Sequence, residues 1–265
     1  MDLGLTGKIA VVTGSDSGIG KATAELLGRE GAKVAVIDKT SEPLEQAAKE
    51  IGHFTEAIAV QAELTKLEEV EAAKRQILER FGTVHILVHA AGITGATGDF
   101  LELSDEEWYQ TIEVDLMAAV RTCRAFIPAM RTDGWGRVIL LSSEDAVQPY
   151  PDEIPYCASK AAVLNLAKSL SKAYAKDGVL VNTVSPAFIA TPMTDAMMEQ
   201  RSKQMGVSCD EAIASFLDQQ RPHIELKRRG QPEEVASVIA FLCSEQSSFV
   251  LGANWRVDGG SVASL

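Results

Sequence analysis

Basic residues are scarce in this sequence. Only 25 lysines and arginines stand against 37 aspartates and glutamates among 265 residues, which gives a formal net charge of −12. A surface of this sign repels phosphate backbones and anionic lipid headgroups. We therefore expect neither nucleic acid nor a membrane surface as a partner.

Cysteines and long apolar runs are also few. The four cysteines are dispersed, and the sequence has no Cys-x-x-Cys pair and no histidine at ligand spacing. This pattern predicts neither a disulfide framework nor a zinc site, so no metal is expected. No stretch reaches the roughly 18 apolar residues of a membrane span, and the N-terminus lacks the basic region of a secretory signal. We expect a cytoplasmic protein.

Short β-branched runs alternate with helical patterns along the whole chain. The hydrophobic content of 46% suffices for a large core, and no linker or repeat divides the sequence, so we expect one domain over residues 1–265. The runs predict strands at 8–12, 33–37, 54–60, 84–88, 138–141, 179–184 and 253–257. Two sequences resemble capping boxes, Thr65-x-x-Glu68 before a helix over 67–81 and Ser104-x-x-Glu107 before a helix reaching about 130. The alternation predicts an α/β fold, a parallel sheet with helices on both faces.

A glycine-rich turn follows the first predicted strand. Gly14, Gly18 and Gly20 have the spacing Gly-x-x-x-Gly-x-Gly, which differs from the Gly-x-Gly-x-x-Gly fingerprint and is weak evidence alone. Its position before a helix could present backbone amides to a pyrophosphate. Asp38 ends the second predicted strand, where an acid binds ribose hydroxyls and repels a 2′-phosphate. This context favours NAD over NADP, although Asp38 could instead be a solvated turn residue and Lys39 could partly compensate a phosphate.

Tyr156 and Lys160 lie four residues apart in a predicted helix over 155–174. Both side chains would rise from one helix face. A tyrosine hydroxyl has a reference pKa of about 10, and a nearby cation lowers it. The pair could exchange protons with a substrate, but the same spacing also fits a solvated surface pair.

The regular alternation lapses after Pro186. Residues 187–229 are polar, charged and rich in methionine, with one helix expected near 210–219. An insertion at this edge of a sheet can cover a ligand, so we expect a substrate lid within 187–229. A surface segment or a subunit contact is the alternative.

Several short motifs occur in one order along the chain: Thr13-Gly14-x-x-x-Gly18-Ile19-Gly20, Ala91-Gly92, Ser143, Tyr156-x-x-x-Lys160, Asn182-x-x-x-Pro186, Pro232-Glu233-Glu234 and Val257-Asp258-Gly259-Gly260. Together they resemble the single-domain branch of the short-chain dehydrogenase/reductases. The resemblance implies a doubly wound Rossmann fold with a seven-stranded parallel sheet, a nicotinamide cofactor and commonly a homotetramer.

The resemblance implies a role for each of four catalytic residues. Tyr156 would be the general acid/base at the substrate oxygen, Lys160 would lower its pKa and hold the nicotinamide ribose, and Ser143 would donate a hydrogen bond to that oxygen. Ser142 is adjacent, and only one of the two serines could easily reach the site. Asp115 replaces an asparagine that supports a water between the lysine and bulk solvent. The backbone carbonyl could keep that relay, although a carboxylate could alter local titration.

The resemblance also implies the cofactor contacts. The pyrophosphate, adenosine and nicotinamide would lie against Gly14, Ser17, Gly18, Ile19, Gly20, Asp38, Glu63, Leu64, Ala91, Gly92, Tyr156, Lys160, Pro186, Ile189 and Thr191. His89 stands where the family commonly has an asparagine, and it could be a site group or a histidine at a strand end.

Residues between Ser143 and Tyr156 border the substrate in the family. The two acids Glu144 and Asp145, together with Gln148, therefore predict a polar or hydroxylated substrate, with Tyr150 as a further contact, although both acids could instead face solvent or cap a turn. Ala187 and Phe188 are the other substrate candidates. We expect NAD(H)-dependent interconversion of a secondary alcohol and a ketone, as a homo-oligomer. The alternatives are a catalytically silent NAD-binding sensor or scaffold and an NADP-dependent 3-oxoacyl thioester reductase.

Overall fold

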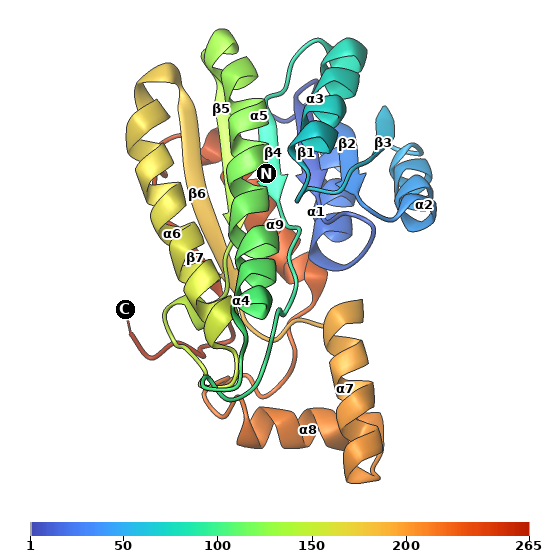
Figure 1. The fold of residues 1–265 in the computed structure, drawn as a ribbon. Helices are drawn as coiled ribbons and strands as arrows, with labels where there is room; N and C mark the ends of the chain where they lie inside the picture. Colours follow the sequence, from blue (N-terminus) through green and yellow to red (C-terminus); the bar gives the residue numbers. More distant parts are fainter. Residues whose placement is uncertain (1, 265) are drawn as a thin grey trace.

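The computed structural model describes residues 2–264, so Met1 and Leu265, the ends of the expected domain, lie outside the described residues. Seven strands within this range form one parallel sheet in the order β3-β2-β1-β4-β5-β6-β7 (Figure 1). They are β1 (Ile9–Thr13), β2 (Lys33–Asp38), β3 (Ala57–Gln61), β4 (Ile86–His89), β5 (Gly136–Leu141), β6 (Val179–Pro186) and β7 (Asn254–Val257). The predicted doubly wound Rossmann fold is confirmed.

Helices cover both faces of the sheet. They are α1 (Gly18–Arg29), α2 (Ser41–Ile51), α3 (Leu67–Phe81), α4 (Asp105–Ile112), α5 (Ala118–Asp133), α6 (Ile154–Tyr174), α7 (Pro192–Met205), α8 (Cys209–Gln219) and α9 (Pro232–Cys243). Neighbouring strand residues point to opposite faces. Val11 accordingly packs in the core with residues of α3, α5 and α6, while Val12 packs with residues of α1, α2 and α9. No helix in residues 2–264 combines the length and hydrophobicity needed to cross a bilayer.

The long helix expected to reach residue 130 is interrupted. A π-helical turn, Glu113–Met117, separates α4 from α5, which then continues to Asp133. The Ser104 capping box is confirmed, since Ser104 Oγ accepts from Glu107 N and Glu107 Oε2 accepts from Ser104 N. The capping box predicted at Thr65 and Glu68 is wrong. Lys66 is the residue before α3 and makes no side-chain cap.

The third strand begins later than predicted, at Ala57 instead of residue 54. The reason is local, because Phe54 N and Thr55 N both donate to Ile51 O and thereby complete the turn after α2. β6 extends two residues beyond the prediction, because Pro186 still lies in register with Val257 of β7.

Residues 187–230 form an excursion that leaves the sheet after β6 and returns beside its own start. The helix predicted near 210–219 is α8, and α7 was not predicted. Ile189 and Gly230 form an isolated parallel bridge that joins the two ends of the excursion. It has a small core of its own, made of Phe188, Met198, Phe216, Leu217 and Ile224. Figure 1 shows α7 and α8 standing beyond the end of the sheet.

Candidate active site

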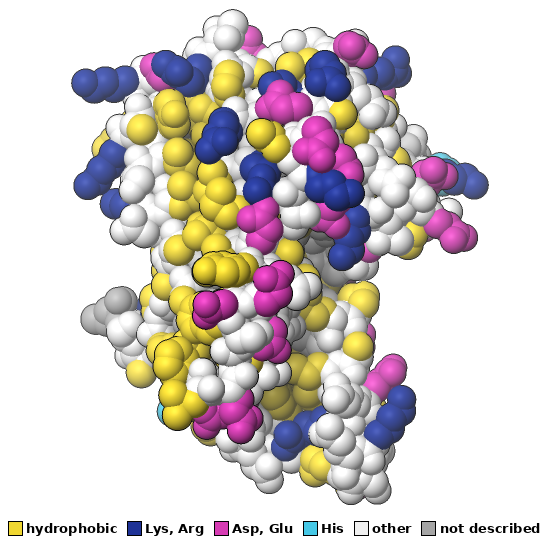
Figure 2. Space-filling view, in the orientation of Figure 1, with side chains coloured by type: hydrophobic (Ala, Val, Ile, Leu, Met, Phe, Trp, Pro, Cys, Tyr) yellow, Lys and Arg dark blue, Asp and Glu magenta, His cyan; other side chains and the backbone are white. Residues whose placement is uncertain are grey.

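A cavity of about 730 Å³ opens at the carboxyl ends of the strands. Gly14 follows β1, Asp38 ends β2 and Pro186 ends β6, and all three line it. Ligands of open parallel sheets bind at this edge, where the strand order reverses. The space-filling view shows the surface hollowed between the body of the molecule and α7 (Figure 2).

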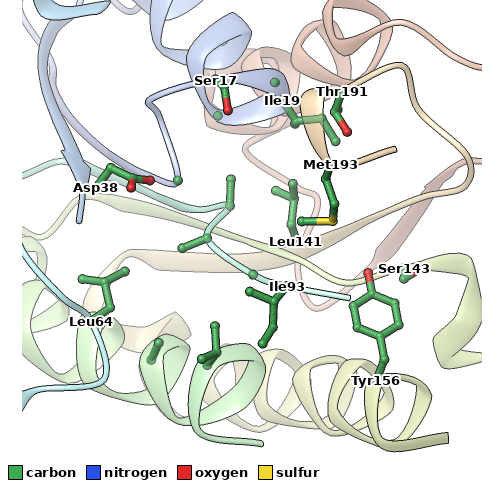
Figure 3. Close-up of a pocket in the computed structure, with 18 of the residues that line it drawn as sticks. Ser17, Ile19, Asp38, Leu64, Ile93, Leu141, Ser143, Tyr156, Thr191 and Met193 are labelled. Atoms are coloured by element: carbon green, nitrogen blue, oxygen red, sulfur yellow. The ribbon is translucent and has the colours of Figure 1, made fainter. Parts of the chain in front are cut away.

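All the residues expected to contact the cofactor line this cavity. They are Gly14, Ser17, Gly18, Ile19, Gly20, Asp38, Glu63, Leu64, Ala91, Gly92, Tyr156, Lys160, Pro186, Ile189 and Thr191. Figure 3 shows how far they spread, with Asp38 and Leu64 at one end and Tyr156 at the other.

The turn between β1 and α1 requires its glycines. A Cβ on Gly20 would lie 2.0 Å from Gly14 O, and a Cβ on Gly14 would lie 2.6 Å from Ala91 N. Gly14 and Gly18 also have φ values of +65° and +54°, which L side chains rarely adopt. Ser17 precedes α1 but makes no capping bond to it, so its first-turn amides have no side-chain acceptor from that residue. Backbone amides at a helix N-terminus against a bare turn fit the pyrophosphate of a dinucleotide.

Acidic groups surround the end of the cavity that carries Asp38. Asp38 Oδ1 accepts from Lys39 N at 2.7 Å and from Thr40 N at 3.3 Å, which fixes the carboxylate at the end of β2. Burial and the neighbouring Asp16 raise the pKa of Asp38. Asp16 and Lys39 also line the cavity, and the charges of both act on the Asp38 carboxyl. Two acids and one lysine thus face this end.

Tyr156 and Lys160 lie one turn apart on α6, as predicted. Figure 3 shows the Tyr156 side chain rising from α6 with its hydroxyl beside Ser143. Ser142 Oγ donates instead to Lys160 O, at 2.9 Å. Ser142 therefore binds the backbone of α6, and Ser143 lies beside the tyrosine hydroxyl.

The expected depression of the Tyr156 pKa by Lys160 is not found. Burial, Asp145 and Asp115 raise the pKa of Tyr156 well above its ordinary value, and a hydrogen bond with Ser143 opposes this only in part. The Lys160 ammonium lies 5.4 Å from the centre of the Tyr156 ring, and its charge is balanced by Asp115. The phenol is consequently protonated at neutral pH, the form that gives up a proton.

Asp115 lies behind Lys160 in the π-helical turn and is 1% exposed. Its Oδ1 is 3.2 Å from Lys160 Nζ and accepts from Ile93 N at 3.1 Å, while Oδ2 has no partner. Burial raises the pKa of Asp115, and Lys160 opposes the shift. The carboxylate itself thus contacts the lysine, the position from which the sequence analysis expected that it could alter local titration.

Comparison with known proteins identifies the family. A family model described as enoyl-(acyl carrier protein) reductase matches residues 13–262. The chain belongs to the short-chain dehydrogenase/reductase family. An uncharacterized oxidoreductase of Bacillus subtilis is 35% identical over the full length of both chains, and a 3-oxoacyl-[acyl-carrier-protein] reductase of Vibrio cholerae is 35% identical over 97% of this chain and 98% of its own.

One solved structure extends the comparison to three dimensions. The L-sorbose reductase of Gluconobacter frateurii, crystallised with NADPH and L-sorbose, superposes with a TM-score of 0.95 and is 36% identical over the full length of both chains. This short-chain dehydrogenase/reductase is therefore an NAD(P)-dependent oxidoreductase of the class that acts on small-molecule alcohols or ketones.

Four of the five expected substrate residues do not line the cavity of this dehydrogenase/reductase. Ala187 lines it, but Glu144 and Asp145 are 1% and 5% exposed and face the guanidinium of Arg221. Tyr150 stacks on that guanidinium, with Arg221 Cζ 3.5 Å from the ring centre. The alternative that both acids face solvent is wrong too, because Arg221 supplies a counter-charge inside the protein.

Phe188, the remaining substrate candidate, packs against Phe216 with ring centres 4.7 Å apart. Other residues of the cavity wall belong to none of the sequence motifs. Ile93 and Met193 line the cavity, as do Glu106, Tyr109, Gln110 and Glu113. The last four are spaced as one helix face, which is the signal that could have found them. Arg221 is one of four arginines in a polar segment and had no such signal.

His89 is a strand-end histidine of the core, one of the two roles considered for it. Its Nδ1 lies 3.1 Å from both Thr13 Oγ1 and Thr122 Oγ1, and its side chain is buried. Thr13 Oγ1 also accepts from Ala90 N and Ala91 N. The ring therefore helps to hold the turn that closes against the glycines. Burial, and to a lesser degree Lys160, lowers the pKa of His89 to about 3.

Proposed function

We propose that this protein is an NAD(H)-dependent oxidoreductase that interconverts a secondary alcohol and a ketone, with Tyr156 as the general acid/base. The observation that carries the proposal is the meeting of Tyr156, Ser143 and Lys160 at one end of a cavity that carries Asp38 at its other end and the glycine turn between them. When bound, the nicotinamide supplies or accepts the hydride.

The side chains of the chain handle the proton. In reduction, the Tyr156 phenol donates its proton to the ketone oxygen while the Ser143 hydroxyl hydrogen-bonds to the same atom. The Lys160 ammonium lies beside the phenolate that remains, 5.4 Å from the ring centre, and Asp115 holds Lys160 in place at 3.2 Å. In oxidation the phenolate takes the proton back. The raised pKa of Tyr156 favours the donating form at neutral pH, and hence reduction.

A Tyr156→Phe variant tests this assignment. We expect it to lose at least about a hundredfold of kcat, because it cannot transfer the proton, while keeping the dinucleotide affinity of the wild type. The assay follows absorbance of the reduced cofactor. Turnover that survives intact in Tyr156→Phe would refute the role, and dinucleotide binding without turnover on any substrate would favour the alternative of a silent sensor or scaffold.

The preference for NAD rests on Asp38 and Asp16. A 2′-phosphate at the adenosine end would meet two carboxylates, against a single compensating Lys39. We expect NADH to bind at least about tenfold more tightly than NADPH, and Asp38→Ser to narrow the difference. Fluorescence titration measures both affinities, with Glu42→Ser as a surface control. Equal affinities in the wild type would overturn the preference.

For the substrate we propose a hydroxylated ketone or the corresponding polyol. The support is the similarity to an L-sorbose reductase and the polar wall that α4 provides with Gln110, Tyr109 and Glu106. An NADP-dependent 3-oxoacyl thioester reductase is the second candidate, supported by the Vibrio cholerae relative. A substrate panel with both cofactors separates them, and a preference for long-chain acyl thioesters would contradict the hydroxylated class.

We also propose that residues 187–229 act as a substrate lid and that the protein is a homotetramer. Thr191, Pro192, Met193 and Thr194, at the start of α7, line the cavity, which supports the lid. We expect NADH to slow amide exchange in α7, and unchanged exchange would contradict closure.

Figure 2 shows hydrophobic side chains gathered over α5 and α6, a surface suited to a second copy. Light scattering after gel filtration measures the assembly.

A further inference from the structure

A buried ion cluster lies directly behind Ser143. It contains Arg221, which follows α8, and three carboxyl groups, those of Glu144, Asp145 and Glu153. Arg221 Nη2 is 3.0 and 3.1 Å from the two Glu153 oxygens, 4.0 Å from Asp145 Oδ2, and its Nε is 3.8 Å from Glu144 Oε1. All four residues are buried, with exposed fractions of at most 9%. One guanidinium cannot balance three buried carboxylates, so the cluster favours retention of a proton.

Glu153 is the acid that keeps the proton. Its carboxyl group and that of Asp145 both face Arg221 Nη2, at 3.0 and 4.0 Å, so two acids compete for one cation. Burial and the neighbouring Asp145 carboxyl raise the pKa of Glu153 to about 7, against the opposing charge of Arg221. The cluster therefore changes charge near neutral pH.

Asp145 is also the direct partner of Ser143. Ser143 Oγ donates to Asp145 Oδ1 at 2.9 Å and accepts from Asp145 N at 3.3 Å. A serine hydroxyl has a single hydrogen, so it cannot point fully at Asp145 and at a substrate oxygen together. The strength of Asp145 as an acceptor decides between the two directions.

We propose that Asp145 is a positioning residue that sets the direction of the Ser143 hydroxyl, and that the proton on the neighbouring Glu153 controls this direction. The inference rests on the proposed function of Ser143. While Glu153 keeps its proton it can donate to the Asp145 carboxylate, which is then a weaker acceptor, and Ser143 donates to the ketone oxygen. Once Glu153 loses that proton, the Asp145 carboxylate captures the hydroxyl hydrogen. Arg221, supplied by the 187–229 segment, sets the pH at which this happens.

Other charged and titratable groups surround the cluster. They are Tyr150 and Asp152 in the preceding loop, Tyr156, Cys157 and Lys160 on α6, Asp115 in the π-helical turn, and Asp258 after β7. Asp152 is exposed and near Glu153, so Asp152→Asn removes one negative charge without touching Ser143 and serves as the matched control.

The kinetic test measures kcat/KM for ketone reduction against pH. We expect a fall of about tenfold between about pH 6 and about pH 8.5 in the wild type and in Asp152→Asn. Asp145→Asn should abolish the fall, because an amide donates to Ser143 at every pH. Arg221→Lys should keep the wild-type profile, and Arg221→Gln should move the midpoint to higher pH, because Arg221 lowers the pKa of Glu153. A fall with an unchanged midpoint in Asp145→Asn would overturn the proposal.

A second measurement needs neither cofactor nor turnover. Carbon-13 NMR of glutamate-labelled protein should show one carboxyl titrating near pH 7 that is missing in Glu153→Gln and titrates at lower pH in Asp145→Asn. If no glutamate titrates above about pH 6, Glu153 does not keep the proton and the proposal fails. If no substrate turns over while this titration is present, the proposed function fails and the cluster stands.

Discussion

Replacing His89 by asparagine tests the physical role of a buried neutral histidine next to the active site. The pKa of His89 is lowered from 6.5 to about 3, so the unfolded chain binds a proton at this residue below about pH 6.5 while the folded protein does not. The contribution of neutral His89 to the free energy of unfolding is therefore fully present above pH 6.5 and is lost as the pH falls toward 3. At about pH 4 the difference covers about 2.5 pH units, which corresponds to about 3 kcal/mol of unfolding free energy.

The assay is urea unfolding of the wild type and His89→Asn at about pH 7 and about pH 4. Asparagine cannot take up the proton, and it can still hydrogen-bond to Thr13. We expect the variant to lose about 3 kcal/mol less than the wild type between the two pH values, whatever its stability at pH 7. His223 is exposed, so His223→Asn should keep the wild-type difference. Equal losses in His89→Asn and the wild type would refute the reasoning.

Three further variants probe the walls of the cavity and the excursion. Asp115→Asn should shift to lower pH the alkaline limb that Tyr156 sets in the pH profile for ketone reduction, because Asp115 raises the pKa of Tyr156. Glu113→Gln is the control and should leave that limb in place. An unmoved limb in Asp115→Asn would contradict the expectation. Gly20→Ala should weaken NADH binding at least about tenfold in a folded protein, because its Cβ would lie 2.0 Å from Gly14 O, and Gly52→Ala should bind normally. Phe188→Ala should cost about 3 kcal/mol of local stability in α7 and α8, seen as faster amide exchange there with an unchanged sheet.

Most of the fold could be predicted because its signals are local. β-branched runs such as Val34 to Ile37 are buried on both sides, and they mark strands whatever lies around them. The π-helical turn at Glu113–Met117 could not be predicted, because the residues keep a helical spacing through it. α7 was missed because only Met198 of its residues is buried, so the helix has no apolar face that a sequence pattern can show.

The site divides in the same way. Short motifs predict the glycine turn, Ser143, Tyr156 and Lys160. They can do so because the fold brings the residues of these motifs to one edge of the sheet. The role of Glu144 and Asp145 could not be reached, because it depends on Arg221, whose partner Glu153 is 68 positions away in the chain. Nothing near either acid indicates that a guanidinium will lie beside it.

Because Ile189 and Gly230 form a bridge, the excursion between them could be exchanged as a unit. Ala190 N donates to Gly230 O at 2.9 Å and Gly230 N donates to Phe188 O at 3.0 Å, so the segment leaves and re-enters the body at one point. Loop-closure entropy changes slowly with length, and a donor segment of different size could be spliced between these ends while β6 and the dinucleotide half stay intact. A graft of this kind would have to carry an arginine equivalent to Arg221, or the acids behind Ser143 would lose their counter-charge.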